Sequence, residues 1–385
     1  MHGGAQVSVA QLAQGLRARG HTVAVLNLDD RAHHGTHAAT GVPEYRLRLR
    51  NLYLRGDHPA PRRVAWHMID RFGDRMAADY RAVLGDFRPD VINTHVMAGI
   101  GTTIWRVAAA FGVPVVHRVS DYYLMCLNSG HRRAGRNCAG VCVSCRLLAL
   151  APARRRTASV AHVVYVSETI RSIHDAYHVF PRDVPATVLA GAYRPARAVP
   201  HRPDLIEPSR LTIGFLGRIS PEKGLDTLLR TLRLLPAGGW RLRVGGEGRA
   251  DYMNELRELA RELPVDFVGV QAPDDFYATV DALVVPSLWD EPSGRVAFES
   301  GIHGVIPIVA ARGGLPEMVA HGERGLVFDP DAPATLLAAL ARVRGEGALR
   351  AQVRARWLAD RGDFDPDVVA GRTLAIYEQL VGTRL

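Results

Sequence analysis

Short apolar runs rich in β-branched residues alternate along the chain with longer segments of helical periodicity. In the first half these runs are 21–28, 45–50, 90–96, 114–119, 162–167 and 186–190, and in the second half they are 211–217, 241–246, 265–269, 282–286, 307–311 and 325–329. Runs of this length between glycine and proline residues are typical of buried strands. Strands that alternate with helices predict an α/β fold with doubly wound parallel sheets.

A segment rich in proline and arginine, 193–203, interrupts both periodicities and separates the two sets of strands. A chain of 385 residues with 47% hydrophobic residues can form two cores. We therefore expect domains at 1–195 and 196–365, facing a cleft, followed by a last helix in 366–385.

Two helical segments of the first half, 5–19 and 61–84, have features that a simple alternation of strands and helices does not predict. Residues 5–19 follow Gly3-Gly4, and Met1-His2 is too short to supply the strand that should lead into that loop, so we expect a start placed too late or a missing first strand. The segment 61–84 mixes Trp66, Met68 and Phe72 with arginines. It is expected to be a core-facing helix, with membrane contact as the alternative.

The net charge of the chain indicates which classes of binding partner to expect. The net charge of +9 favours nucleotides, acidic lipid headgroups or nucleic acid. No apolar stretch approaches the roughly 20 residues that span a bilayer, and no signal pattern opens the chain, so we expect a cytoplasmic protein or a peripheral one at the inner membrane face. Of 48 Lys and Arg residues only Lys223 is lysine, which indicates a role that a planar guanidinium would fill poorly.

Two glutamates mark the strongest candidate site. Glu291 follows the strand 282–286, Pro292 and Gly294 are expected to open the next helix, and Glu299 lies two turns further on nearly the same side. Ligands bind at this edge of a parallel sheet, where carboxylates can accept hydrogen bonds from sugar hydroxyls. The alternative is a helix cap and a solvated charge.

Two cations stand at the corresponding place after the first strand of the second half. Arg218 and Lys223 are five residues apart, and a diphosphate suits an arginine clamp and a lysine point charge. Gly245-Gly-Glu-Gly248 ends the next strand and would bring bare backbone to the same edge. A solvated basic loop is the alternative.

In order, these motifs are Gly3-Gly4, Gly217-Arg218 with Lys223-Gly224, Gly245 to Gly248, Glu291 with Glu299, and Gly313-Gly-Leu-Pro-Glu317. This order resembles the retaining GT-B glycosyltransferases of family 4 over almost the whole chain. The resemblance implies two Rossmann-like domains, a nucleotide-sugar donor, linked to UDP or GDP, held mainly by the second domain, and an acceptor held mainly by the first. It also implies that the last helix crosses back to the first domain.

The same resemblance implies roles for single residues. Arg218 and Lys223 would hold the diphosphate, Glu299 the ribose, and Glu291 a hydroxyl of the transferred sugar; Arg218, Lys223 and Glu291 form the expected catalytic set. The full expected donor set is Gly3, Gly4, Arg218, Lys223, Gly246, Glu291, Ser293, Gly294, Arg295 and Glu299.

No side chain is an obvious covalent nucleophile. The resemblance implies that the acceptor attacks from the face that the diphosphate leaves, and that the departing phosphate oxygen deprotonates the acceptor hydroxyl. The Asp-x-Asp matches at 329–331 and 363–365 look like helix-start acids, so no catalytic metal is expected.

The chain departs from the family pattern where many relatives have His-Asp, because it has Ser120-Asp121. His95, His117 and Asp121 are candidates for the acceptor side. The acceptor is expected to be a glycan, a lipid-linked saccharide or a small metabolite. A satisfied structural histidine is the alternative for the two strand histidines.

Four cysteines, Cys126, Cys138, Cys142 and Cys145, cluster within a loop expected at 121–147. In a cytosolic protein such clustering indicates structural zinc rather than disulfides. Four reduced thiols in an acceptor loop are the alternative.

Two other functions compete with a transferase. A GT-B sugar-nucleotide epimerase would share the diphosphate clamp, but the spacing of Glu291 and Glu299 is of the transferase type. A zinc-containing nucleic-acid-binding protein would fit the basic charge and the cysteines. The chain lacks aromatic and basic residues interleaved in the way nucleic-acid binding requires, so we expect no nucleic-acid partner.

Overall fold

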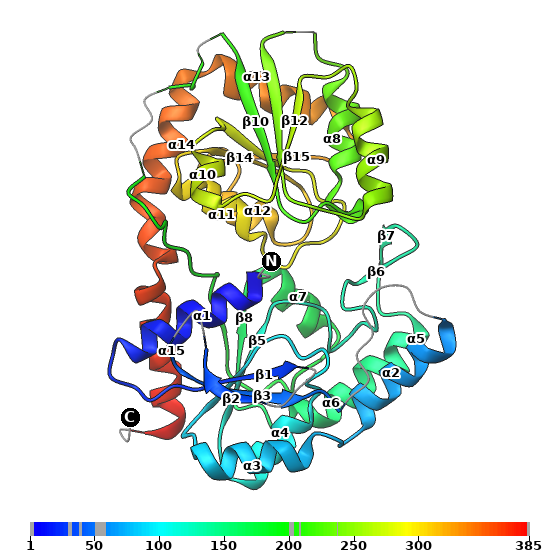
Figure 1. Ribbon diagram of the computed structural model, residues 1–385, viewed down its shortest axis with the longest axis vertical. Coiled ribbons are helices and arrows are strands. Elements are labelled where there is room, and N and C mark those ends of the chain that lie inside the picture. Colours follow the sequence, from blue (N-terminus) through cyan, green and yellow to red (C-terminus); the bar gives the residue numbers. More distant parts are fainter. Residues whose placement is uncertain are drawn as a thin grey trace. The chain divides into compact units, whose positions relative to one another are not determined.

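The computed structural model describes residues 4–29, 33–37, 41–50, 59–199, 204–207, 209–236 and 238–382. The chain divides into two compact units, each with its own sheets and helices (Figure 1). The first unit comprises Met1–His131, Cys138–Ala192 and Phe364–Leu385, and the second comprises Arg132–Asn137 and Tyr193–Asp363. The expected change of domain near residue 195 therefore corresponds to a boundary between Ala192 and Tyr193.

The second unit is built on one parallel six-stranded sheet in the order β12-β11-β10-β13-β14-β15. Its strands are β10 (Leu211–Leu216), β11 (Trp240–Gly245), β12 (Val265–Gly269), β13 (Ala282–Val285), β14 (Ile306–Ala310) and β15 (Leu326–Phe328). The order reverses direction between β10 and β13, so the loops that follow these two strands lie at a topological switch point. The predicted strands agree with these to within one or two residues.

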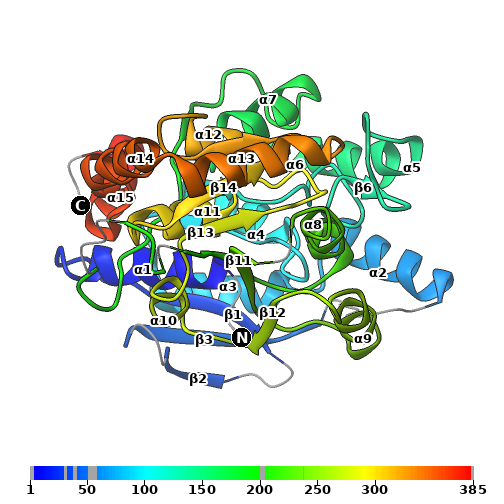
Figure 2. The same ribbon diagram turned by 90° about the horizontal axis from the view of Figure 1, so that it is seen from above.

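Helices cover both faces of this sheet (Figure 2). Helix α8 packs with α9 and α13, whereas α11 packs with α12 and α14. The helices are α8 (Leu225–Leu232), α9 (Ala250–Leu259), α10 (Pro273–Tyr277), α11 (Arg295–Ile302), α12 (Leu315–Val319), α13 (Pro333–Gly345) and α14 (Gly347–Asp360), and a 3-10 turn, η2 (Pro221–Lys223), precedes α8. Strands β13 and β14 are buried throughout, which explains why their sequences are continuous apolar runs.

The described strands of the first unit form two main sheets rather than the single parallel sheet that the alternation predicts. One is parallel, in the order β4-β5-β8-β9, and the other has the order β1-β3-β2 with β2 antiparallel to β3. The strands are β1 (Val25–Asp29), β2 (His33–Thr36), β3 (Pro43–Arg48), β4 (Ile92–Thr94), β5 (Val115–Val119), β8 (His162–Tyr165) and β9 (Ala186–Val188).

The helices of the first unit include one departure from prediction. The segment 61–84 is not one helix, because it divides at Gly73 into α2 (Ala60–Phe72) and α3 (Ala77–Phe87). The others are α1 (Gly4–Arg17), α4 (Thr103–Ala110), α5 (Val143–Cys145), the π-helical turn η1 (Arg146–Leu150), α6 (Ala151–Thr157) and α7 (Glu168–Ala176). A short hairpin, β6 (Arg132–Arg133) with β7 (Arg136–Asn137), belongs to the second unit and had no counterpart in the predicted elements.

The last helix, α15 (Pro366–Val381), belongs to the first unit, as the sequence predicted. It packs along α1, and its core cluster contains Leu16, Val369, Ile376 and Tyr377. Asn93 Nδ2 donates to Tyr377 Oη at 2.6 Å, which ties the helix to β4. The chain thus returns to the first unit after the second is complete.

Candidate active site

The loop after β10 carries the two predicted cations. Arg218 lies just beyond the strand, with a side chain that is 68% exposed and donates to Glu222 Oε1 at 2.8 Å. Lys223 ends the 3-10 turn η2 and forms an ion pair with Glu291. The structure thus joins Lys223 directly to the glutamate that the sequence places on another loop.

Glu291 is held from several sides. The residue is 6% exposed, and its carboxylate accepts a hydrogen bond from Ser287 Oγ at 3.1 Å in addition to the Lys223 contact. Its backbone carbonyl accepts from the Gly314 N–H at 2.7 Å. A buried carboxylate needs such partners, because desolvation without them would be costly.

Two glycines allow the loops around Glu291 to approach. A methyl group on Gly313, which has φ +55°, would lie 2.2 Å from the Glu291 carbonyl oxygen. One on Gly224, with φ +71°, would lie 2.0 Å from the Pro286 carbonyl oxygen. Only glycine permits both this conformation and this distance, so the glycines of the predicted motifs bring the loops together.

Glu299 lies within α11 and forms the second acidic site. Arg295 donates to its Oε1 through Nε at 3.0 Å and a terminal nitrogen at 2.9 Å, and Tyr277 Oη lies 3.3 Å from Oε2. Burial raises the pKa of Glu299 above its ordinary value, and the nearby Arg295 guanidinium opposes that rise. Glu299 is therefore a buried acid that a single arginine keeps paired.

Of the two residues expected to open α11, Gly294 is the N-cap, whereas Pro292 lies in the preceding loop. The helix begins at Arg295, after Gly294 in the left-handed region with φ +73°. Glu299 consequently lies about one turn inside the helix rather than two, while Pro292 and Ser293 belong to the loop. The half-buried Ser293 and Gly294 lead directly into the amino terminus of α11.

The glycine loop after β11 approaches the loop after β10. A methyl group on Gly246, which has φ +133°, would lie 1.8 Å from the Gly217 carbonyl oxygen. The Ile219 N–H donates to the Glu247 carbonyl at 2.8 Å. The close backbone approach that the sequence predicts at Gly246 is thus present, with another loop of the same unit as the neighbour.

All these loops leave the carboxyl ends of parallel strands, so they occupy one edge of the second unit's sheet. The edge carries an exposed guanidinium, a lysine and two buried carboxylates. Such a set can bind a diphosphate through its cations and hydroxyl groups through its carboxylates. Ser287 and Tyr277 were missed, because a lone serine in a strand-end loop and a tyrosine at a helix end carry no distinctive pattern.

The acceptor-side candidates lie in the first unit. His117 is buried in β5, where its Nδ1 lies 2.9 Å from Thr94 Oγ1 and its ring contacts Trp105 and Phe180. Burial lowers its pKa to about 3, which keeps the ring neutral. These contacts favour the structural interpretation for His117.

His95 lies just after β4 and Asp121 just after β5, whereas His117 lies within β5. Burial also lowers the pKa of the half-buried His95 to about 3. Burial raises the pKa of Asp121, whose Oδ1 accepts from the Tyr123 N–H at 2.8 Å.

The two glycines predicted on the donor side lie at the start of the chain. Gly4 is the exposed first residue of α1, and Gly3 lies outside the described residues.

The four cysteines form no disulfide in the described structure, with Cys126 buried and the others half-buried. The Leu127 N–H lies 3.5 Å from Cys145 Sγ, and Cys126 Sγ lies 2.7 Å from Asn128 Oδ1. Burial raises the pKa of the Cys145 thiol to about 12, and the neighbouring Cys126 and Cys142 add to the rise. Among the described residues no three His, Cys, Asp or Glu side chains are gathered closely enough to hold a metal ion.

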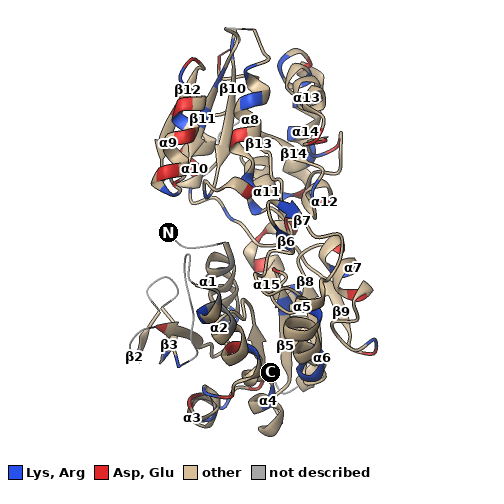
Figure 3. Ribbon diagram, turned by 90° about the vertical axis from the view of Figure 1, so that its right-hand side faces the viewer, with Lys and Arg blue, Asp and Glu red and all other residues tan. Residues whose placement is uncertain are grey.

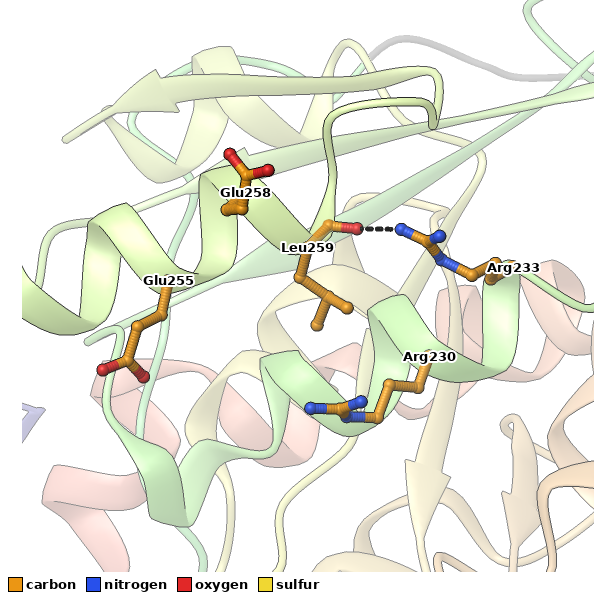
Figure 4. A pocket seen from close by; sticks show the side chains of 5 residues that line it. All are labelled: Arg230, Arg233, Glu255, Glu258 and Leu259. Atoms are coloured by element: carbon orange, nitrogen blue, oxygen red, sulfur yellow. Dashed lines mark hydrogen bonds between the residues drawn. The ribbon is translucent and has the colours of Figure 1, made fainter.

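Hollows occur in both units, and the one described in the first unit has the acceptor-side candidate His95 in its lining. The one in the second unit lies between α8 and α9 and is lined by Arg230, Arg233, Glu255, Glu258 and Leu259 (Figure 4). Its two arginines come from α8 and its C-cap and its two glutamates come from α9, and Arg233 donates to the Leu259 carbonyl at 2.7 Å. A small one in the first unit is lined by Ser8, Leu12, Asn93, His95, Arg118, Val164, Ala192, Pro366, Val369 and Thr373.

Two family models together match nearly the whole chain. Residues 3–192 match a glycosyl transferase 4-like domain, and residues 201–356 match glycosyl transferases group 1. A 42.6 kDa protein in the cps region of Klebsiella pneumoniae is 27% identical over 320 residues, which is 82% of this chain and 83% of that protein. A D-inositol 3-phosphate glycosyltransferase of Thermomonospora curvata is 35% identical over 180 residues, only 42% of this chain and 41% of that enzyme.

Solved structures share the fold over the full length. HepE from Anabaena, in complex with UDP and glucose, has a TM-score of 0.71 at 16% identity and covers 98% of this chain and 96% of its own. Sucrose-phosphate synthase from Thermosynechococcus elongatus has a TM-score of 0.72 at 19% identity, with 98% and 94% covered. In the part of the chain that the structure describes, no helix has the length and apolarity to cross a bilayer. The predicted GT-B fold is confirmed, and the chain belongs to the group 1, family 4-type glycosyltransferases.

Proposed function

We propose that the protein transfers a sugar from a nucleoside-diphosphate sugar held at the sheet edge of the second unit. The observation that carries this proposal is the Lys223–Glu291 ion pair, which brings a cation and a carboxylate from different loops to one point. Arg218 extends from the same loop with most of its side chain exposed. Two cations at this edge fit a diphosphate, and the paired carboxylate fits a sugar hydroxyl beside it.

In this proposal the bound diphosphate becomes an additional ionic partner of the Lys223 ammonium. The ammonium exchanges part of its contact with Glu291 for phosphate oxygens, and the released carboxylate oxygen accepts a hydroxyl of the sugar. Ser287 keeps the carboxylate in place during this exchange through its 3.1 Å hydrogen bond. As the bond to the sugar breaks, the cations stabilise the charge that develops on the leaving diphosphate.

Glu299 is proposed to accept the ribose hydroxyls. Arg295 and Tyr277 hold its side chain at a fixed place in α11, one turn from the helix amino terminus. A fixed carboxylate binds two neighbouring hydroxyls without paying the entropy of ordering.

The proposed reaction retains the anomeric configuration and needs no catalytic metal. The acceptor hydroxyl attacks from the face that the diphosphate leaves, and the departing phosphate oxygen takes its proton. The aspartates of the two Asp-x-Asp matches have other partners: Asp365 caps α15 by accepting from the Asp367 N–H at 2.8 Å, and Asp331 pairs with Arg312.

The proposed donor is linked to UDP or GDP, and similar folds have been solved with UDP, UDP-glucose and ADP. The acceptor is proposed to be a saccharide, a lipid-linked saccharide or a small metabolite. The protein is proposed to act in the cytoplasm.

A panel of nucleoside diphosphates and their sugars tests the donor proposal by thermal shift. The nucleoside diphosphate with the correct base should raise the melting temperature, and so should the corresponding nucleoside-diphosphate sugar. Ligands that bind only the folded state stabilise it. The increase should vanish in Glu299→Ala and persist in Glu258→Ala, a glutamate on α9 outside the site. No shift with any member of the panel would overturn the proposal.

We also propose structural zinc bound by Cys126, Cys138, Cys142 and Cys145, because four thiolates suit Zn²⁺. The four thiols would have to move closer together to bind it, since no three of them are gathered at one point in the described structure. Elemental analysis of the protein purified without chelators should find one zinc per chain, lost in Cys142→Ser with Cys145→Ser. A zinc-free native protein would contradict this assignment.

A further inference from the structure

A surface of the first unit combines exposed apolar side chains with exposed arginines. It consists of the outward residues of α2, α5, η1 and α6, and we call it the α2–α6 face. Helix α2 contacts both η1 and α6, so these elements lie side by side (Figure 1). The apolar side chains are Met68, Phe72, Val143 and Leu147, with exposures of 43%, 43%, 75% and 62%.

Contacts of α2 fix which side of the helix faces outward. Arg71 is buried and donates to the carbonyls of Tyr123 at 2.7 Å and Cys126 at 2.9 Å. Asp70 is buried beside it and accepts from Tyr123 Oη at 2.6 Å. The buried polar residues of the helix, Asp70 and Arg71, thus point inward, whereas Met68 and Phe72, four residues apart, share an exposed side.

The charge of the neighbouring segment has one sign. Between Cys138 and Ser167, within the first unit, the sequence has four arginines and no aspartate or glutamate. Arg156 pairs with Asp74 at 3.2 Å, and Arg154 donates to backbone carbonyls, while Arg146 and Arg155 are exposed. Figure 3 shows the basic positions along the stretch from α5 to α6.

We propose that the α2–α6 face docks on the surface of an anionic phospholipid bilayer. Apolar side chains of this size enter the boundary between headgroups and acyl chains, and arginines beside them attract anionic headgroups. Nucleic acid would match the charge but leave Val143 and Leu147 in water, so the combination of both features favours lipid. The inference does not depend on which donor the second unit binds.

Cosedimentation of the full chain with lipid vesicles tests this proposal. The protein should pellet with vesicles containing phosphatidylglycerol and stay in solution with pure phosphatidylcholine, and binding should weaken as salt rises. Leu147→Gln should lower the partition coefficient about tenfold. Leu358→Gln is the matched control, because Leu358 is also 62% exposed but lies on α14 of the second unit.

Arg146→Gln and Arg155→Gln test the charge separately. Each should lower binding to the anionic vesicles about fivefold, whereas Arg230→Gln on α8 should leave it unchanged. Circular dichroism melting should show that all these exposed variants remain folded.

Three results would overturn the proposal: equal binding to both kinds of vesicle, equal loss in Leu147→Gln and Leu358→Gln, or a dimer in solution that Leu147→Gln abolishes. The last would identify the face as a contact between two copies of the chain. Thermal shift with nucleotides reports on the second unit and would distinguish a failure here from a failure of the donor assignment.

Discussion

Glu299 combines burial with ionic pairing at a single residue. Removal from water favours its protonated form, while Arg295 at 2.9–3.0 Å favours the carboxylate. The balance leaves its pKa above the ordinary value of about 4.3 for glutamate. Its charge is therefore lost at a higher pH than that of an exposed glutamate.

Donor affinity should fall on acidification with a midpoint above the ordinary glutamate value. Protonation removes an acceptor of ribose hydroxyls and the partner of Arg295, so the nucleotide binds more weakly below the raised pKa. Titration calorimetry of the nucleoside diphosphate across pH would measure this effect. Glu299→Gln should bind weakly at every pH in this range, and an unchanged pH profile in that variant would assign the titration to another group.

Gly313 allows a second test at the scale of one residue. Gly313→Ala forces a side chain into the left-handed region and places Cβ 2.2 Å from the Glu291 carbonyl oxygen. Gly322→Ala has a similar positive φ, +84°, with no atom within 4 Å. We expect about 1–2 kcal/mol of destabilisation from conformation alone at Gly322 and a larger loss at Gly313. Denaturant unfolding that gives equal losses would contradict the close packing of the two loops.

At the scale of elements, the pairing of α1 with α15 depends on a glycine. A methyl group on Gly15 would lie 2.6 Å from Ala370 Cβ. Arg19, on the turn after α1, donates to the Asp367 carbonyl at 2.6 Å and so fixes the same contact at its end. The two helices come from opposite ends of the sequence, and their contact closes the first unit.

Gly15→Ala should destabilise the protein although alanine is the better helix former. The gain in helix propensity is about 1 kcal/mol, and the clash with Ala370 should exceed it. Gly85→Ala is the matched control, because Gly85 lies in α3 with no atom within 4 Å of an added methyl group. Melting temperatures should fall for the first variant and rise for the second. A rise in both would show that α1 and α15 are less closely packed.

At the scale of the whole molecule, the sequence predicts the second unit better than the first. Its strands are buried on both faces, so their apolar runs are continuous and their limits are clear, as in Ala282–Val285. In the first unit, β2 has the sequence His-His-Gly-Thr, which has no apolar period and was not predicted. The antiparallel pairing and the separation into two sheets depend on tertiary contacts that local patterns do not encode.

The candidate site likewise has features that the sequence predicts and features that it does not. Lys223 was recognisable because it is the single lysine among 48 basic residues, and Glu291 and Glu299 because they flank a strand-to-helix turn. The direct Lys223–Glu291 pair could not be predicted, because it joins residues 68 positions apart on loops whose approach depends on Gly224 and Gly313. Ser287 likewise acquires a role only through its distance to Glu291.

Turnover of Lys223→Ala with the donor that the thermal-shift panel identifies is the most direct test of the central claim. If Lys223 stabilises the leaving diphosphate, kcat should fall about 10²-fold or more, while Arg230→Ala on α8 should retain the activity of the unmodified protein. A folded Lys223→Ala protein with nearly unchanged kcat would contradict the assignment of this sheet edge as the donor site.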